Sequence, residues 1–159
     1  MKGNPRVIEL LNEAIKAELT AINQYWLHYR MLENWAIKRL AEYERKESFH
    51  EMKHADRFSE RVLFLDGLPN FQALGRLRIG ESVEEILKAD LEAEYEAVEM
   101  YRNGVAECEK LGDFVSRELF EEVLRDEEGH VDFLETQFEM IKQMGLQNYI
   151  QLQSEPAED

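Results

Sequence analysis

The sequence has little of what a sheet protein or a disulfide-stapled domain needs. Its 159 residues include 3 prolines, 8 glycines and a single cysteine, Cys108. One cysteine excludes an internal disulfide framework, and so few turn residues argue against a fold of many short strands. The charged fraction is 33%, which is typical of long amphipathic helices. The sequence therefore predicts an all-α fold.

Basic residues and long apolar runs are also scarce. Lys and Arg number 19 against 34 acidic residues, which gives a formal net charge of -15. An acidic surface repels phosphate backbones and anionic lipids, so we expect no nucleic acid and no membrane as partner. Cations are favoured instead, although simple solubility also explains the charge. The length fits a single domain over residues 1–159. Because the sequence shows no signal-like or membrane-spanning stretch, we expect the protein in the cytoplasm.

Apolar residues recur at steps of three and four, which predicts four long helices and one short one. Asp66-Gly67-Leu68-Pro69 ends the second helix, where Gly67 suits a left-handed cap, and Ser82-Val83-Glu84-Glu85 is a capping box for the third. The expected helices and the acidic tail that follows them cover about 5–32, 37–65, 82–111, 113–145, 146–153 and 154–159.

Loop lengths predict the topology. The joins near Asn34 and Gly112 are short, so the helices on either side of each should be antiparallel neighbours. The join from Asp66 to Glu81 is long enough to carry the chain the length of a bundle between the second and third helices. Two antiparallel hairpins joined by one long crossover form a ferritin-like four-helix bundle.

Each long helix carries ionisable residues within its apolar stripe. Buried carboxylates are costly unless positive charge compensates them, and no Lys or Arg shares their phase, so a metal is the expected partner. Four carboxylates and two imidazoles suit two ions of iron or manganese better than zinc. The expected ligands are Glu18, Glu51, His54, Glu94, Glu127 and His130.

A constant offset in residue number links these residues. The same offset relates Glu18 to Glu94, Glu51 to Glu127, His54 to His130 and Tyr25 to Tyr101. A tandem origin would explain the offset without chemistry, but it would not keep polar residues in core phase. A single Glu-x-x-His in a Glu-rich chain would be read as a solvated face. Two of them, in register with two further inward Glu residues, favour a dinuclear metal centre.

Several longer stretches of the sequence resemble one known family, the bacterioferritins, which are the haem-containing ferritins of bacteria. The resemblance covers nearly the whole chain. The similar stretches are Asn23-Gln24-Tyr25, Glu51-Met52-Lys53-His54-Ala55-Asp56-Arg57, Gly67-Leu68-Pro69-Asn70, Leu124-Arg125-Asp126-Glu127-Glu128-Gly129-His130 and Met144-Gly145-Leu146-Gln147-Asn148-Tyr149.

The resemblance implies a shell of twenty-four subunits that stores ferric mineral. Each subunit would be a ferroxidase that oxidises iron(II) with oxygen or peroxide, and an electron-donor protein would serve iron release. Two iron ions per subunit would be bridged by Glu51 and Glu127. The remaining ligands would be Glu18 with His54 for one iron and Glu94 with His130 for the other.

The resemblance also implies a b-type haem shared between two subunits, with Met52 as its axial ligand. At about 100° per residue, Met52 points away from the direction that Glu51 and His54 share. The first helix carries a second apolar stripe, which suggests a buried partner surface. A methionine that merely fills an interface is the alternative. The residues of the second stripe are Ile15, Leu19, Ile22 and Trp26.

Tyr25 lies on the face of Glu18, two turns further along the helix. It is expected either to hydrogen-bond a ligand or supply an electron, or to be a core aromatic with a satisfied hydroxyl. Lys46 and His50 stand where some family members carry His and an acidic residue for an inner-surface iron. Because an ammonium repels a nearby cation, we expect no such site here.

Two other functions remain open at this stage. One is a di-iron or di-manganese peroxidase or catalase without storage, and the other is a structural bundle that binds no metal. A large assembly that retains iron would distinguish storage from both.

Overall fold

The computed structural model describes residues 1–156 as a bundle of helices, which confirms the all-α prediction. Of the acidic tail expected at 154–159, residues 157–159 lie outside the described part. Within the described residues, no helix combines the length and apolar character needed to cross a membrane. The helices are α1 (Pro5–Asn34), α2 (Lys38–Phe64), α3 (Val83–Lys110), α4 (Phe114–Met144) and α5 (Leu146–Gln153).

The helix ends follow the capping signals of the sequence, with one correction. Ser82 Oγ accepts a hydrogen bond from the Glu85 N–H at 3.2 Å, as the capping box predicts. The left-handed residue after α2 is Asp66, with φ 59°, and not Gly67. Gly67 instead donates its N–H to the Val62 carbonyl at 2.9 Å, which places it one position further on in a Schellman motif. A Cβ on Gly67 would lie 2.9 Å from Ile8 Cγ2, so packing requires the glycine.

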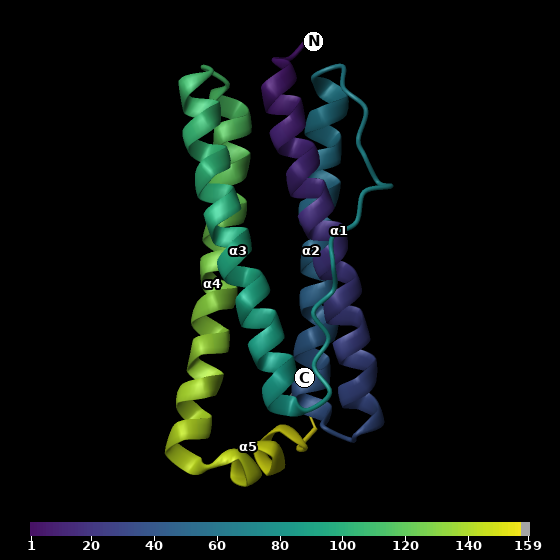
Figure 1. Ribbon diagram of the computed structural model, residues 1–159, viewed down its shortest axis with the longest axis vertical. Coiled ribbons are helices and arrows are strands. Elements are labelled where there is room, and N and C mark those ends of the chain that lie inside the picture. Colours follow the sequence, from purple (N-terminus) through teal and green to yellow (C-terminus); the bar gives the residue numbers. More distant parts are fainter. Residues whose placement is uncertain (157–159) are drawn as a thin grey trace.

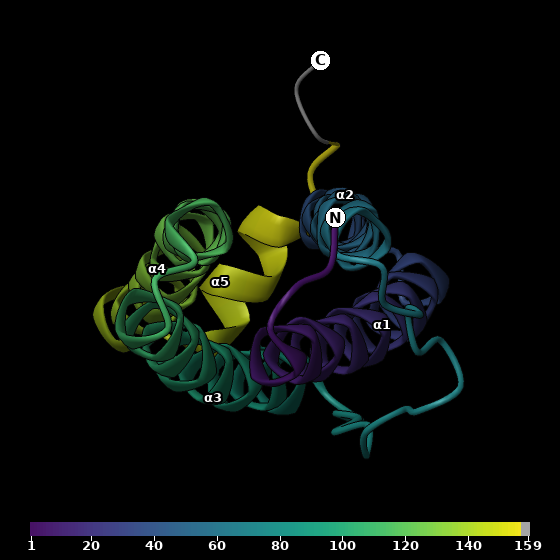
Figure 2. The same ribbon diagram turned by 90° about the horizontal axis from the view of Figure 1, so that it is seen from above.

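The topology is that predicted for a ferritin-like bundle. Helices α1 and α2 form one antiparallel hairpin, and α3 and α4 form the other (Figure 1). The crossover between α2 and α3 runs along the outside of the bundle from one end to the other (Figures 1 and 2). Helix α5 lies across the end opposite the N-terminus, where the Tyr149 hydroxyl donates to Gln137 Oε1 of α4 at 2.8 Å.

Polar side chains on one face of α1 hold the crossover in place. Thr20 Oγ1 accepts from the Gly75 N–H at 2.8 Å, and Gln24 Oε1 accepts from the Arg78 N–H at 3.0 Å. One turn further, His28 Nε2 accepts from the Gly80 N–H at 3.0 Å. The acceptors are spaced by four residues, so they lie on one stripe and satisfy the backbone of a segment that has no secondary structure of its own.

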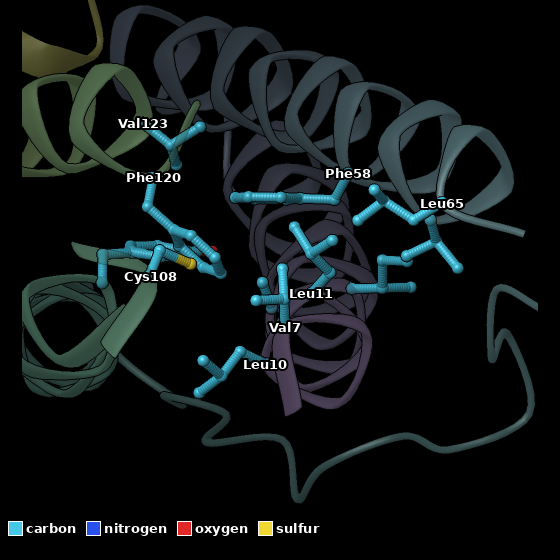
Figure 3. Packing of buried hydrophobic residues seen from close by; sticks show 12 residues of the cluster. Val7, Leu10, Leu11, Phe58, Leu65, Cys108, Phe120 and Val123 are labelled. Carbon is cyan, nitrogen blue, oxygen red and sulfur yellow. The ribbon is translucent and has the colours of Figure 1, made fainter. Parts of the chain in front are cut away.

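Two apolar clusters fill the ends of the bundle. One gathers Leu11, Phe58 and Phe120 with their neighbours near the N-terminus (Figure 3), and the other surrounds Leu87 and Leu134 near α5. Ionisable residues occupy the middle, between the clusters.

One position differs from the sequence interpretation. Ile15, expected in the outward stripe of the first helix, is fully buried in the cluster near the N-terminus. Ala21 and Ala97 are only partly buried because they line a cavity between α1 and α3. A methyl group is too short to fill this space, so the cavity stays open beside the polar centre.

Candidate dinuclear metal site

The six ionisable residues predicted from their phase lie together in the middle of the bundle, and all are buried. They form two groups of four whose ligand atoms lie within 4.8 Å of one another. Glu51 and Glu127 belong to both groups. The groups are Glu18, Glu51, His54 and Glu127, and Glu51, Glu94, Glu127 and His130.

The two shared carboxylates each face both histidines. Glu127 Oε1 lies 3.1 Å from His54 Nδ1, and Glu127 Oε2 lies 3.1 Å from His130 Nδ1. Glu51 is placed in the same way, with Oε2 3.7 Å from His54 Nδ1 and Oε1 3.4 Å from His130 Nδ1. A carboxylate between two imidazole nitrogens has the geometry of a bridging ligand.

The remaining carboxylates each belong to one half of the centre. Glu18 Oε1 lies 3.6 Å from His54 Nδ1, and Glu94 Oε1 lies 3.4 Å from His130 Nδ1. The hydroxyl of Tyr25 donates to Glu94, whereas the hydroxyl of Tyr101 donates to Glu18. Each tyrosine therefore holds the carboxylate of the other hairpin. Tyr25 is both a core aromatic and a hydrogen-bond donor to a candidate ligand.

The protonation of the centre is shifted by burial. Burial raises the pKa of Glu18 and Glu51, and it raises the pKa of Glu94 to about 8. Burial alone would lower the pKa of His54 and His130, but the surrounding carboxylates raise the pKa of both above the usual range. Protons thus neutralise part of the negative charge when no cation is present.

The donor atoms fit a pair of cations. Four atoms that face the centre have no aligned hydrogen-bond partner within residues 1–156, namely Glu18 Oε2, Glu51 Oε1, Glu127 Oε1 and His54 Nδ1. Buried polar atoms are rarely left unpaired. A centre rich in carboxylate oxygen, with one imidazole for each ion and no thiolate, suits iron or manganese.

Two carboxylates behind the histidines were not identified from the sequence. His54 Nε2 lies 3.1 Å from Asp126 Oδ2 in a hydrogen bond, and His130 Nε2 lies 2.6 Å from Glu47 Oε2. Glu47 has the same spacing of three and four residues as Glu51 and His54, so its helical phase could have shown that it points into the bundle. Asp126 is exposed and adjacent to Glu127, and its role depends on the fold.

A second buried polar cluster lies beyond Tyr25, towards α5, and was also missed. His28 Nδ1 lies 2.9 Å from Asp90 Oδ1 and 4.0 Å from Glu44 Oε2, and all three side chains are fully buried. Because His28 Nε2 accepts from the Gly80 N–H, Nδ1 carries the ring proton and donates to Asp90. Burial and the neighbouring Asp90 raise the pKa of Glu44 well above its usual value, which favours the neutral form of this carboxyl group. This cluster anchors the end of the crossover.

The centre is reached from two sides. A cavity of about 520 Å³ between α1, α3 and the crossover touches its four carboxylates. A second cavity of about 530 Å³, between α2 and α4, touches His54 and His130 together with Glu47 and Asp126. Small molecules and ions therefore have a route to each half of the centre.

Met52 lies outside the centre, as its phase predicted. Its side chain is 50% exposed, compared with 2% for the adjacent Glu51. Trp26 and Phe49 are also exposed and pack edge to face with ring centroids 5.9 Å apart. We call Trp26, Phe49 and Met52 the α1/α2 apolar patch. The patch presents a thioether and two aromatic rings at the surface.

The expectation of no inner-surface iron site concerns Lys46 and His50. Lys46 is exposed. His50, however, lies 3.2 Å from Glu47 Oε1 and forms a third candidate group with Glu47 and His130. The absence of iron beside Lys46 stays a prediction.

Comparison with known proteins assigns the family. The sequence model of the ferritin-like domain family matches residues 8–144. The bacterioferritin of Brucella melitensis biotype 1 is 52% identical over 159 residues, which is 100% of this chain and 99% of the relative. That of Rhodobacter capsulatus is 48% identical and covers 99% of the chain and 98% of the relative, and that of Mycolicibacterium paratuberculosis is 47% identical with 94% of each covered. The chain therefore belongs to the ferritin-like domain family and, within it, to the bacterioferritins.

Proposed function

We propose that this chain is the subunit of an iron-storage shell and that its buried centre oxidises iron(II). The observation that carries the proposal is the pair of four-residue groups with Glu51 and Glu127 in common. No other arrangement within the described residues places two such groups side by side with shared carboxylates. The relatives named bacterioferritin support the same function.

The residues divide into two roles. Glu51 and Glu127 would be shared by both ions, because each has one oxygen towards His54 and the other towards His130. Glu18 with His54 and Glu94 with His130 complete the two halves. Bound at these residues, two iron(II) ions would give one electron each to a single oxidant. This transfer would reduce oxygen to peroxide or peroxide to water and leave two iron(III) ions. Tyr25 and Tyr101 orient Glu94 and Glu18, and the raised pKa values of the carboxyl groups mean that protons leave as the ions bind.

The α1/α2 apolar patch is proposed as a contact between two subunits. At the offset in residue number that relates the ligands, its counterparts on the second hairpin are charged: Arg102, Arg125 and Glu128. Only the first hairpin therefore exposes aromatic surface at this position. About a twofold axis, each subunit would contribute one Met52 thioether to one b-type haem. A haem held in this way supplies one-electron transfer, which suits delivery of electrons from a donor protein for iron release.

The test replaces Glu94, which serves only one half of the centre. Glu94→Ala should remove most of the rapid oxidation of iron(II), followed by absorbance of the ferric product, because one ion loses its terminal carboxylate. Glu92→Ala is the matched control, since Glu92 is an exposed glutamate on the same helix. Circular dichroism should show the same helix content in both variants.

Wild-type oxidation kinetics in Glu94→Ala would contradict the proposal. Size-exclusion chromatography with iron analysis separates storage from the alternative, a di-iron or di-manganese peroxidase or catalase. A shell of twenty-four subunits should elute far ahead of a dimer and retain iron. A small oligomer that turns over peroxide without retaining iron would favour the alternative.

A further inference from the structure

Both histidines of the centre have a carboxylate behind them. Each ring points Nδ1 towards Glu51 and Glu127, so Nε2 points outwards. Behind His54 lies Asp126, and behind His130 lies Glu47. Each outer carboxylate comes from the opposite hairpin, because Asp126 belongs to α4 and Glu47 to α2. A carboxylate at this position fixes the ring and increases the basicity of the nitrogen that binds metal.

The two outer carboxylates differ in burial. The side chain of Glu47 is 7% exposed, and its Oε2 lies 2.6 Å from His130 Nε2. The side chain of Asp126 is 57% exposed, and its Oδ2 lies 3.1 Å from His54 Nε2. The Asp126 contact is an aligned hydrogen bond, whereas Glu47 Oε2 has no aligned donor within residues 1–156. At 2.6 Å the Glu47 carboxylate is nevertheless in direct contact with the His130 ring nitrogen.

The two hairpins do not share these outer carboxylates. The constant offset that relates the ligands places Val123 opposite Glu47 and His50 opposite Asp126. The ligands of the two halves are therefore alike in type, whereas the residues that contact Nε2 of the two histidines differ. His50 increases this difference, because its Nδ1 lies 3.2 Å from Oε1 of Glu47.

Burial decides which carboxylate has the larger effect. Water and salt screen the charge of an exposed carboxylate, and its side chain loses rotamer freedom to hold one position. A carboxylate inside the bundle is screened far less and is already held by packing. Glu47 should therefore strengthen His130 as a ligand more than Asp126 strengthens His54.

We infer that Glu47 and Asp126 are positioning residues that make the two metal positions unequal, so that the Glu94–His130 position binds its divalent cation first and more tightly. The inference rests on the proposed dinuclear centre. Oxidation needs both ions, so the weaker Glu18–His54 position sets how the rate depends on iron(II) concentration.

The test uses Co²⁺, which binds oxygen and nitrogen ligands and reports its coordination in its visible spectrum. The assembled, metal-free protein is titrated with Co²⁺ and followed by calorimetry and absorbance. The wild type should bind two ions per subunit in two resolved steps. Glu47→Gln should weaken the first step by about tenfold to a hundredfold, and Asp126→Asn should weaken only the second and by less. Both changes remove charge and keep an oxygen acceptor.

Glu121→Gln is the matched control, because Glu121 is an exposed glutamate on α4. It should leave both steps unchanged. A crystal of the wild type with one equivalent of Co²⁺ should show the anomalous signal between Glu94 and His130, and this observation does not depend on how any variant folds.

The outcomes separate this inference from the proposed function. No binding of Co²⁺ by the wild type would remove the dinuclear centre itself. Two ions bound with equal affinity, a first ion between Glu18 and His54, or equal weakening of both steps in Glu47→Gln would overturn the inference and leave the centre in place.

Discussion

The two helical hairpins carry the same candidate ligands but present different surfaces to their surroundings. On the first hairpin, Trp26, Phe49 and Met52 form an exposed apolar patch. At the corresponding positions, the second hairpin has an ion pair between Arg102 and Glu128 at 3.1 Å, with Arg125 nearby in sequence. Aromatic side chains stabilise a protein when they are removed from water, whereas charged side chains are well solvated at the surface. The difference supports the proposed contact between subunits on the first hairpin.

The two hairpins also differ inside the bundle. The polar cluster of His28, Glu44 and Asp90 lies between the metal centre and the apolar cluster near α5, and the same offset in residue number relates His28 to Gly104 and Glu44 to Phe120. Gly104 leaves room for Phe120, because a Cβ there would lie 2.6 Å from the ring. The counterparts of His28 and Glu44 on the second hairpin are therefore packed against each other without polar groups.

The largest effect is expected on haem content, from a substitution in the α1/α2 apolar patch. Met52→Leu should yield an assembled shell that oxidises iron(II) but contains no haem, because leucine has no thioether to bind the haem iron. The counterpart Glu128→Leu is the control and should retain haem. Haem content is measured by absorbance relative to protein. Full haem occupancy with an unchanged spectrum in Met52→Leu would rule out the ligand role.

A second comparison concerns the interior of the two hairpins. Phe120→Ala should lower the free energy of unfolding by about 3–5 kcal/mol, because it leaves a cavity among packed aromatic rings. Glu44→Gln should change it by less than about 1 kcal/mol, because the raised pKa favours the uncharged form of Glu44 and the amide has a similar shape. Urea unfolding of the metal-free protein at fixed subunit concentration measures both. A larger loss in Glu44→Gln would show that Glu44 is charged.

The smallest effect is the pH dependence of the metal-free protein. The pKa of Glu94 is raised from 4.5 to about 8 in the folded protein, so between these values the folded state holds a proton that the unfolded chain releases. The contribution of Glu94 to the free energy of unfolding is therefore fully present below about pH 4.5 and is lost as the pH rises towards 8. The raised pKa values of His54 and His130 act in the same direction above pH 6.5. Calorimetry should show Tm decreasing by several degrees over this range.

Filling the centre supplies the control for this titration. Bound Zn²⁺ replaces the protons, so the decrease in Tm should disappear in the loaded protein. Glu94→Gln should also flatten it in the metal-free protein, because the amide does not titrate. A Tm that rises between pH 4.5 and 8 in the metal-free wild type would contradict the assignment of the raised pKa values.

Helix positions and caps were predicted well because they depend on neighbours in sequence. The capping box at Ser82 involves residues three apart. The cap after α2 was assigned to the wrong residue because glycine is the usual left-handed residue. Packing decided otherwise, since Ile8 and Val62 leave no space for a side chain at Gly67, and Asp66 adopts the left-handed conformation instead.

The candidate ligands were predicted for a similar reason, but their surroundings were not. Glu47 shares the stripe of Glu51 and was overlooked only because a Glu-rich helix has many candidates. Tyr25 was expected to hydrogen-bond a ligand or to be a core aromatic, but the sequence did not show that its partner would be Glu94 on another helix. A helical phase states which way a side chain points and does not state which helix it meets.

The sequence by itself determined the helices, their order and the inward direction of the six candidate ligands, because these follow from spacings of three and four residues and from loop lengths. Only the tertiary structure decided that Glu51 and Glu127 each face both histidines, that the tyrosines cross between hairpins, and that Glu47 is buried while Asp126 is exposed. Those features depend on distances of a few ångströms between helices that are far apart in the chain. Local periodicity carries no information about such distances.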